Sequence, residues 1–561
     1  MRTKFPGNSN SFARSGAFLA FLMATPAPVG ADEARAPVSH RVINATIDAV
    51  LSAKSPPRLR DPSPEARASA VASLATTRPH IVVLMTDDLD ERDLNLAIEN
   101  GFMPNLEAHL ISQGVHFSES FVSNPLCCPS RATFLTGQYA HNNGVYSSDF
   151  VMGGGVTFLE DESTVATWLQ TAGYRTGFVG KYLNGYGLDR RQSPRDDLDY
   201  VPPGWDDWQG LVGHVLRLYN YQVNDNGTLC SYGDAEADYQ TDVLADRAVD
   251  FVHETGPTGR PLFLYLSTVA PHLERPSLVQ CNVGPRGVNM GSIRPAPRHS
   301  GSAAHIDIPP PPALNEADTR DKPAYLNQYW PPISAEGLSC LDQVTRSRIE
   351  SIRAVDDLLG DLVLALEDQE MWENTAIFFT SDNGYLIGQH RVTNKQWVYE
   401  ESIRVPLYLR LPGASQQSSR QMVINNDLAP TIADLAEVTP SHVVDGRSLL
   451  PLFEPGSSAG WRQSMLVEHW GPTEHWGLSG IPWPMPTYFA VRTAVSHPRH
   501  PSKIYVNHAD GAEELYDLNL DPHQLESRHQ SMTESQRTNA RKRTSALAKC
   551  KGGDCVELEN R

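Results

Sequence analysis

The sequence predicts an α/β fold with a large, mostly parallel sheet flanked by helices and a smaller C-terminal α+β subdomain. Three short apolar runs predict buried strands, each followed at once by polar residues: His80–Thr86, Pro261–Ser267 and Thr375–Thr380. Between them, Tyr239–Glu254 and Thr345–Glu370 carry apolar residues at spacings of three and four, which is typical of amphipathic helices. Alternating strands and helices favour a parallel sheet, in which ligands bind at the carboxyl ends of the strands.

The first strand is preceded by segments that we expect to lie outside the fold. Arg2, Lys4 and Arg14 come before a short apolar stretch, Gly16–Ala24, and small residues at 29–31 offer a cleavage site, which indicates a signal peptide over residues 1–31. The alternative is a disordered leader on a cytosolic protein. The apolar stretch is too short to cross a bilayer, and no later segment is long and apolar enough. We therefore expect an exported protein, either secreted, periplasmic or lysosomal, that binds no membrane.

Composition divides the remaining chain into three parts. Residues 32–78 are rich in Ala, Pro, Arg and Ser, which predicts a weakly ordered lead-in. Residues 79–454 form the predicted main domain, in which the Pro-rich excursion 276–334 is a candidate lid or specificity loop. Residues 455–561 form the predicted C-terminal subdomain and tail. Its short strand-like runs are Phe489–Val495, Lys503–Val506 and Glu514–Leu518.

Composition also limits the function. Hydrophobic residues make up 40% of the chain and charged residues 20%, which is ordinary for a soluble enzyme. The formal net charge of −19 argues against a nucleic-acid binder, which needs a basic surface to neutralise phosphates. It gives no global attraction for an anionic substrate either. A site for such a substrate must therefore be locally cationic.

The chain has seven cysteines, and an odd count leaves at least one without an intramolecular partner. A disulfide between Cys550 and Cys555 would staple a small C-terminal loop. The other pairings stay open. Asn44 and Asn226 each begin an Asn-X-Thr sequence, which predicts N-glycosylation if the source is a eukaryote.

The run from Leu126 to Gly137 (LCCPSRATFLTG) resembles the sulfatase signature C-x-P-S-R-x-x-x-L-T-G at every fixed position. The resemblance covers residues 78–454 strongly and 514–527 weakly. It implies an alkaline phosphatase-like fold and hydrolysis of a sulfate ester. It also implies that a separate formylglycine-generating enzyme oxidises Cys127 to formylglycine, with Cys128 a bystander. Consumption of Cys127 would also explain the odd cysteine count.

The local sequence suits such a reactive group. Pro129 fits the first turn of a helix that could run through Phe134 to a stop at Gly137. Unpaired N–H groups at a helix N-terminus favour anions, and Arg131 adds a fixed positive charge one turn further on.

Two pairs of polar residues follow predicted strands, and both resemble metal ligands of the family: Asp87 with Asp88, and Asp382 with Asn383. Oxygen ligands of this kind suit calcium or magnesium rather than zinc. We expect one calcium ion, bound by these four residues together with the modified Cys127.

Three further residues match catalytic groups of the family. The resemblance implies that Lys181 binds the sulfate and the formylglycine hydroxyl, that Lys395 contacts the sulfate and the leaving oxygen, and that His272 protonates the leaving group. The implied mechanism is covalent. One hydroxyl of the hydrated aldehyde attacks sulfur, and the second then loses its proton to expel sulfate. Calcium and the cationic side chains would offset charge on the sulfuryl oxygens.

One position departs from the pattern. Many sulfatases read G-K-x-H around the lysine, whereas here Leu183 stands at the histidine position, followed by Asn184. The Lys-Tyr-Leu-Asn form resembles N-acetylglucosamine-6-sulfatases and some secreted arylsulfatases. His141 and His390 are candidates for the missing base.

Two other functions stay open from the sequence. The wider superfamily includes phosphodiesterases and phosphonate monoester hydrolases, and a secreted binding protein could keep this fold without activity. The substrate is either a sulfated sugar or an aryl sulfate. Aromatic residues that could stack on a ring are Trp470, His475, Trp476 and Trp483.

Overall fold

The computed structural model describes residues 78–148, 155, 159–187, 197–277, 280–283, 289–453, 460–471 and 485–561. The predicted signal peptide, nearly all of the lead-in, Asn44 and the boundary at residue 454 lie outside the described residues, as do His475, Trp476 and Trp483. In the described part of the chain, no helix combines the length and apolar character needed to cross a bilayer.

Among the described residues, ten strands form one sheet in the order β13-β2-β12-β11-β1-β8-β4-β5-β6-β7. Its centre is parallel, as predicted. The central strands are β11 (Thr375–Ser381), β1 (His80–Thr86), β8 (Leu262–Ser267), β4 (Arg175–Gly180) and β5 (Asp207–Val212).

Antiparallel strands extend the sheet on both sides of this centre, and the sequence analysis did not identify them. They are short, so their apolar pattern is weak. On one side lie β12 (Leu407–Arg410), β2 (Val115–Phe117) and β13 (Gln417–Ser419), the last parallel to β2, and on the other β6 (Gln222–Asp225) and β7 (Thr228–Ser231).

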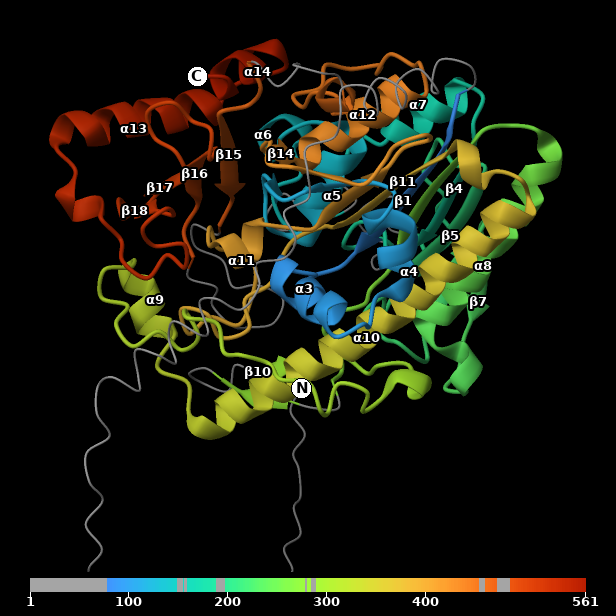
Figure 1. The fold of residues 1–561 in the computed structure, drawn as a ribbon, viewed down its shortest axis with the longest axis horizontal. Coiled ribbons are helices and arrows are strands. Elements are labelled where there is room, and N and C mark those ends of the chain that lie inside the picture. The colour runs from blue at the N-terminus through green and yellow to red at the C-terminus, as the bar shows by residue number, and fades with distance from the viewer. Residues whose placement is uncertain are drawn as a thin grey trace, which may run out of the picture. The chain divides into compact units, whose positions relative to one another are not determined.

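Both faces of the sheet are buried under helices (Figure 1). Along β1, Val82 and Leu84 enter one core, whereas Ile81, Val83 and Met85 enter the other, because successive side chains of a strand point to opposite faces. The first core includes α3 (Glu91–Glu99), α4 (Pro104–Leu106), α8 (Gln240–Thr255) and α10 (Ala335–Asp368), and the second α5 (Cys127–Thr136), α7 (Val165–Thr171) and α12 (Leu428–Leu435).

Helix α10 begins ten residues before the predicted Thr345. Leu338, Leu341 and Val344 continue the helical spacing through these first turns, so the predicted start was too late. The start is set by Ser334, whose side chain accepts a hydrogen bond from the Gly337 N–H at 3.1 Å. A disulfide between Cys340 and Cys281 then joins these turns to β9 (Gln280–Asn282) of the Pro-rich excursion.

The C-terminal part holds an antiparallel sheet with two helices, which agrees with the predicted α+β subdomain. Its elements are β15 (Ser464–His469), β16 (Tyr488–Thr493), β17 (Lys503–His508), β18 (Glu513–Asp517), α13 (Glu534–Leu547) and α14 (Gly553–Glu559). Short connecting elements elsewhere are β3 (Ser120–Phe121), α6 (Ala140–Asn143), β10 (Asn289–Gly291), α9 (Ala324–Tyr329), α11 (Glu400–Ile403) and β14 (Val423–Ile424).

The predicted disulfide between Cys550 and Cys555 is present. Cys127 is one of three free cysteines, and the other four of the seven form two disulfides. Cys128 and Cys230 are also unpaired. Cys128 is fully buried in the second core and Cys230 lies on β7.

Candidate active site

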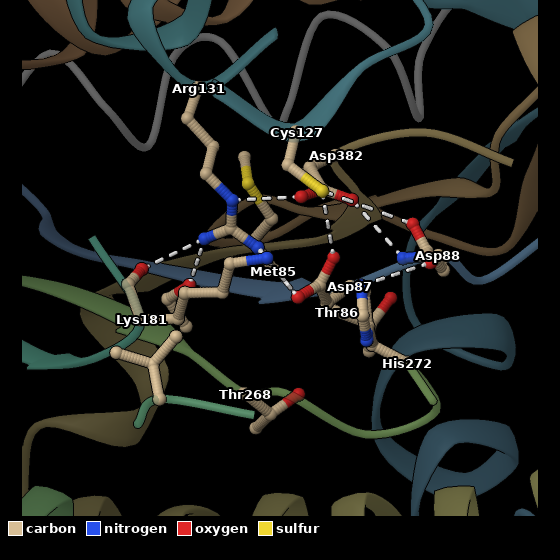
Figure 2. A network of polar contacts seen from close by, with 12 residues as sticks. Met85, Thr86, Asp87, Asp88, Cys127, Arg131, Lys181, Thr268, His272 and Asp382 are labelled. Carbon is tan, nitrogen blue, oxygen red and sulfur yellow. Dashed lines mark hydrogen bonds and ion pairs between the residues drawn. The ribbon is translucent and has the colours of Figure 1, made fainter. Parts of the chain in front are cut away.

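The two predicted pairs of metal ligands lie side by side at the carboxyl ends of β1 and β11. These strands pair in parallel, with Thr86 opposite Ser381, so the residues that follow each strand meet at one edge. The Asp88 N–H donates to Asp382 Oδ1 at 3.1 Å, and the Asn383 amide donates to Asp88 Oδ1 at 2.6 Å. Asp87, Asp88, Asp382 and Asn383 are fully buried. Figure 2 shows Asp87, Asp88 and Asp382 turned toward one another.

Asp88 has a φ of 65°, a left-handed conformation that is unfavourable for most residues with a side chain. Two contacts stabilise it. The next N–H, of Leu89, donates to Ser381 Oγ at 2.9 Å, and the Asp88 carboxylate is held by Asn383. Strained backbone of this kind is often found at functional sites, where surrounding contacts compensate for it.

Helix α5 brings Cys127 to these carboxylates. The helix begins at Cys127 after an extended Leu126 and ends at Thr136, with Gly137 left-handed at φ 68°, close to the predicted limits. The Cys127 thiol therefore lies at the helix N-terminus. It donates to Asp87 Oδ1 at 3.3 Å and lies 4.0 Å from Asp88 Oδ1 (Figure 2).

Arg131, one turn into α5, is 1% exposed and reaches back across the site. Its Nε donates to Asp382 Oδ2 at 2.8 Å, and its Nη1 donates to the Lys181 carbonyl at 2.8 Å and to Ser267 Oγ. Its Nη2 lies 3.9 Å from Asp87 Oδ2. The guanidinium thus connects α5 with the ends of β11, β4 and β8.

Two lysines complete the charge balance. Lys181 follows β4 and pairs with Asp87, and Lys395 pairs with Asp88. The Lys395 ammonium also donates to Cys127 Sγ at 2.6 Å. Three buried carboxylates therefore face three buried cations, counting Arg131, and Cys127 lies between them.

His272 lies in the loop after β8 and faces the second carboxylate oxygen of Asp88. Its Nδ1 lies 2.8 Å from the Leu273 carbonyl, which can only accept, so Nδ1 carries the hydrogen. This leaves Nε2 facing Asp88 Oδ2 at 3.5 Å. Burial lowers the pKa of His272 to about 4.

The carboxylates differ in their electrostatic surroundings. Burial opposes ionisation of Asp87, but the nearby cations, Lys181 foremost, outweigh it and hold its pKa well below the ordinary value. Burial and the Asp87 charge raise the pKa of Asp382 to about 6. Burial, with Asp382 and Asp87, also raises the pKa of the Cys127 thiol.

The donor set fits a hard divalent cation. Asp88 Oδ2 and Asn383 Oδ1 are buried oxygens that accept no hydrogen bond from any described residue. Ligand atoms of Asp87, Asp88, Cys127 and His272 lie within 4.8 Å of one another. Carboxylate and amide oxygens at this density are typical of calcium and magnesium sites.

Neither candidate for the missing base contacts Cys127, and both have structural partners. His141 lies between Glu468 Oε2 and the Cys550 carbonyl, each at 3.0 Å. His390 is fully buried, with Nδ1 2.6 Å from Glu316 Oε2. Leu183 is buried as well, packed in the second core. Trp470, the one described aromatic residue of the four proposed to stack on substrate, packs against Tyr146 and Phe489.

The sequence analysis missed Arg348. This residue of α10 is fully buried, and its guanidinium donates to the Asp88 carbonyl at 2.6 Å and to the Pro271 carbonyl at 3.1 Å. It also donates to Asp93 Oδ2 at 2.7 Å. It thus fixes the backbone beside both Asp88 and His272. An arginine on the apolar face of a helix was the available signal.

Comparison with known proteins identifies related sequences. A family model described as Sulfatase matches residues 79–438, and one described as N-sulphoglucosamine sulphohydrolase, C-terminal, matches residues 388–549. An N-acetylglucosamine-6-sulfatase from Capra hircus is 31% identical over 513 residues, 86% of this chain and 86% of the relative.

Solved structures share the fold. BT4656 in complex with its substrate D-glucosamine-2-N,6-O-disulfate has a TM-score of 0.61 at 22% identity, covering 84% of this chain and 97% of that one. The phosphonate monoester hydrolase of Agrobacterium radiobacter has a TM-score of 0.57 at 22% identity, covering 83% and 95%. At these identities the fold alone is shared, and the fold hosts more than one reaction.

The choice among reactions comes from the sequence family. The Sulfatase model spans more than half of the chain and includes every predicted site residue, from Asp87 to Lys395. The chain therefore belongs to the sulfatase family and is a sulfuric ester hydrolase.

Proposed function

We propose that the chain removes the sulfate ester of a sulfated amino sugar, with N-acetylglucosamine 6-sulfate as its simplest substrate. The observation that carries the proposal is the position of Cys127, at a helix N-terminus and in contact with Asp87 and Lys395. The choice of sugar over aryl sulfate is supported by the Capra hircus relative, which is named for this substrate.

Cys127 is the proposed site of formylglycine. Once formed, the hydrated aldehyde would supply a hydroxyl as nucleophile toward sulfur. The surroundings of Cys127 suit that group: Lys395 is placed to donate to it, Asp87 to accept from it, and the helix N-terminus favours negative charge.

Asp87, Asp88, Asp382 and Asn383 are the proposed ligands of one calcium ion, together with the modified residue 127. A bound calcium would polarise oxygens placed against it and offset negative charge. The buried carboxylates and cations of the site balance one another, so a divalent cation would make it cationic. That property is needed to attract a sulfate ester to a chain with a net charge of −19.

The remaining residues have proposed roles in charge and proton transfer. Arg131 and Lys181 would neutralise the sulfuryl oxygens, because both are held rigidly within the site. Lys395 contacts Asp88 Oδ1 and could donate a proton to the departing sugar oxygen. His272 faces Asp88 Oδ2 through its unprotonated Nε2, so it would act as the proton donor only after this nitrogen has taken up a proton.

Export is proposed as well. The two disulfides support it, because disulfides persist mainly in oxidising compartments. Asn226 lies in the exposed turn between β6 and β7, and its amide already donates to Asp207 and Asp225. Glycosylation there would replace one of the two amide hydrogens, so at most one of these hydrogen bonds could remain.

A substrate panel tests the function. The calcium-loaded protein, produced with a formylglycine-generating enzyme, is assayed on N-acetylglucosamine 6-sulfate, 4-nitrophenyl sulfate and 4-nitrophenyl phosphate. We expect the highest kcat/KM on the sugar sulfate. Faster hydrolysis of the phosphate would contradict the proposal. Mass analysis of the peptide containing Cys127 checks the modification, and chelation followed by calcium or magnesium identifies the metal.

A further inference from the structure

Two adjoining cavities lead away from the active site. The first, of about 270 Å³, is lined by Lys181 together with Asn184, His214 and Arg275, and we call it the near pocket. The second, of about 710 Å³, is lined by Arg217, Asn220, Tyr221 and Tyr232, and we call it the far pocket. Gly213 and His214 belong to the walls of both. The far pocket therefore adjoins the near pocket.

Each pocket has an arginine in its lining although the chain is strongly acidic, and Lys181 of the near pocket is already paired with Asp87. Lys181 and Arg275 line the near pocket, Arg217 lines the far pocket, and no described lining residue of either is Asp or Glu. The lining of another cavity, of about 540 Å³, differs in this respect, because it contains four aspartates. The net charge of −19 makes this absence of carboxylates unusual. The pair of pockets favours an anionic ligand.

Arg217 has hydrogen-bonding capacity left over. Its Nε is buried and donates no hydrogen bond to any described residue, and its guanidinium has no ion pair among them. Its backbone is fixed, because the Gln240 amide donates to the Arg217 carbonyl at 2.7 Å and to the Val215 carbonyl at 3.1 Å. Arg217 thus combines a fixed backbone with a buried, unused Nε donor, and a guanidinium suits a carboxylate or a sulfate group.

The far pocket also offers a flat aromatic wall. Tyr221 and Tyr232 are stacked, with ring centroids 5.0 Å apart and planes 12° apart. Arg247 donates to the Tyr232 hydroxyl at 2.9 Å and holds this ring in place. The buried Tyr221 hydroxyl has no hydrogen-bond partner among the described residues. Aromatic rings with polar groups at their edges suit a sugar ring.

We propose that the substrate is an oligosaccharide whose second sugar carries an anionic group, and that Arg217 in the far pocket binds this group. The inference rests on the proposed function, since the sulfated sugar must occupy the near pocket beside Lys181. Arg217 is then a specificity-determining residue, in contact with substrate but remote from the sulfate ester that is cleaved.

The test compares kcat/KM for three disaccharides that share a terminal N-acetylglucosamine 6-sulfate. Their second sugars are neutral, carboxylated or sulfated. We expect the wild-type enzyme to favour one or both anionic disaccharides over the neutral one by about tenfold or more, the effect of a charged hydrogen bond. In Arg217→Gln the ratio falls toward one. Whichever anionic disaccharide the wild-type enzyme prefers identifies the anion as carboxylate or sulfate.

Two further variants make the result decisive. Arg217→Lys keeps the positive charge and is expected to retain part of the preference, so that a loss in Arg217→Gln reports charge and not packing. Arg420→Gln is the matched control, because Arg420 is exposed, unpaired among the described residues and follows β13 at the opposite edge of the sheet. It should keep the full preference.

Equal kcat/KM for the three disaccharides in the wild-type enzyme would overturn the inference. So would a preference that persists in Arg217→Gln. Both outcomes leave the proposed function intact. That function fails separately if the wild-type enzyme hydrolyses neither the monosaccharide sulfate nor any of the disaccharides.

Discussion

Cys127 and Cys128 are neighbouring buried thiols with different surroundings. Cys127 contacts Asp87 and Lys395, whereas Cys128 packs in the apolar second core. We expect Cys127→Ser to lower kcat on the order of 10³-fold or more, as removal of a nucleophile does. Cys128→Ala should cost about 1 kcal/mol of stability and keep most activity. Kinetics and urea unfolding of both variants check this, and equal losses of activity would contradict it.

Arg348 is a positioning residue, because it holds the backbone of Asp88 and Pro271. It donates to the Asp88 and Pro271 carbonyls and pairs with the buried carboxylates of Asp93 and Asp90. Removal of one partner of a buried ion pair typically costs about 3–5 kcal/mol, because the other charge stays buried and unpaired. We expect this loss for Arg348→Met in urea unfolding.

A positioning role for Arg348 predicts more than instability. Below the unfolding temperature, Arg348→Met should also bind calcium more weakly, because Asp88 is no longer fixed. Arg348→Lys should recover part of that affinity. The exposed Arg420→Gln is the control for both readouts. Unchanged calcium affinity in folded Arg348→Met would reduce its role to stability alone.

At the scale of single elements, helix α5 depends on its C-terminal glycine. Gly137 has φ 68°, and a Cβ there would lie 3.1 Å from Val444 Cγ1. We expect Gly137→Ala to cost about 1–2 kcal/mol for the left-handed backbone, with crowding in addition. The control is Gly101→Ala, with φ 70° and no atom within 4 Å of the added Cβ. Thermal unfolding compares them, and an equal loss would count against crowding at Val444.

The two disulfides constrain very different lengths of chain. Cys281 and Cys340 are 59 residues apart, and Cys550 and Cys555 are five apart. In the chain-entropy account, the longer loop stabilises by about 4 kcal/mol and the shorter by about 2. We expect Cys340→Ser to lower the midpoint of urea unfolding more than Cys550→Ser does. The reverse order would show that native contacts outweigh chain entropy.

Sequence periodicity identified long elements better than short ones. The core strands β1, β8 and β11 were predicted within one residue, because fully buried strands are apolar throughout. The antiparallel strands β12, β6 and β7 were missed, since strands of four residues leave little pattern to detect. The start of α10 is marked by the Ser334 cap, which apolar periodicity does not register.

At the scale of the whole molecule, buried histidines should make the protein sensitive to acid. Burial, with a smaller effect of His508, lowers the pKa of His469 to about 3. The ring also packs on Tyr488, and its Nδ1 is buried without a described partner. In the unfolded chain the pKa is about 6.5. The folded state thus favours the neutral form, and this stability is present above pH 6.5 and lost as pH falls toward 3.

The expected loss from His469 is about 1.4 kcal/mol per pH unit below 6.5. Urea unfolding at pH 7.5 and pH 5.5 measures it in the wild-type protein and in His469→Phe, which should lose less stability on acidification. The exposed His253→Gln serves as control and should behave as wild type. An identical loss in all three proteins would exclude His469 as a source of acid sensitivity.

The sequence by itself determined the family, the fold class and the main site residues, because Cys127, Asp87 and Asp382 belong to short segments whose residues are adjacent in the chain. The tertiary structure alone decided how these segments meet. Asp88 and Asp382 come together through the pairing of β1 with β11, and Arg348 reaches Asp88 from a helix 260 residues away in sequence. The pockets beside Lys181 likewise depend on residues from several strands and loops. Such contacts depend on packing between distant segments, which no local pattern encodes.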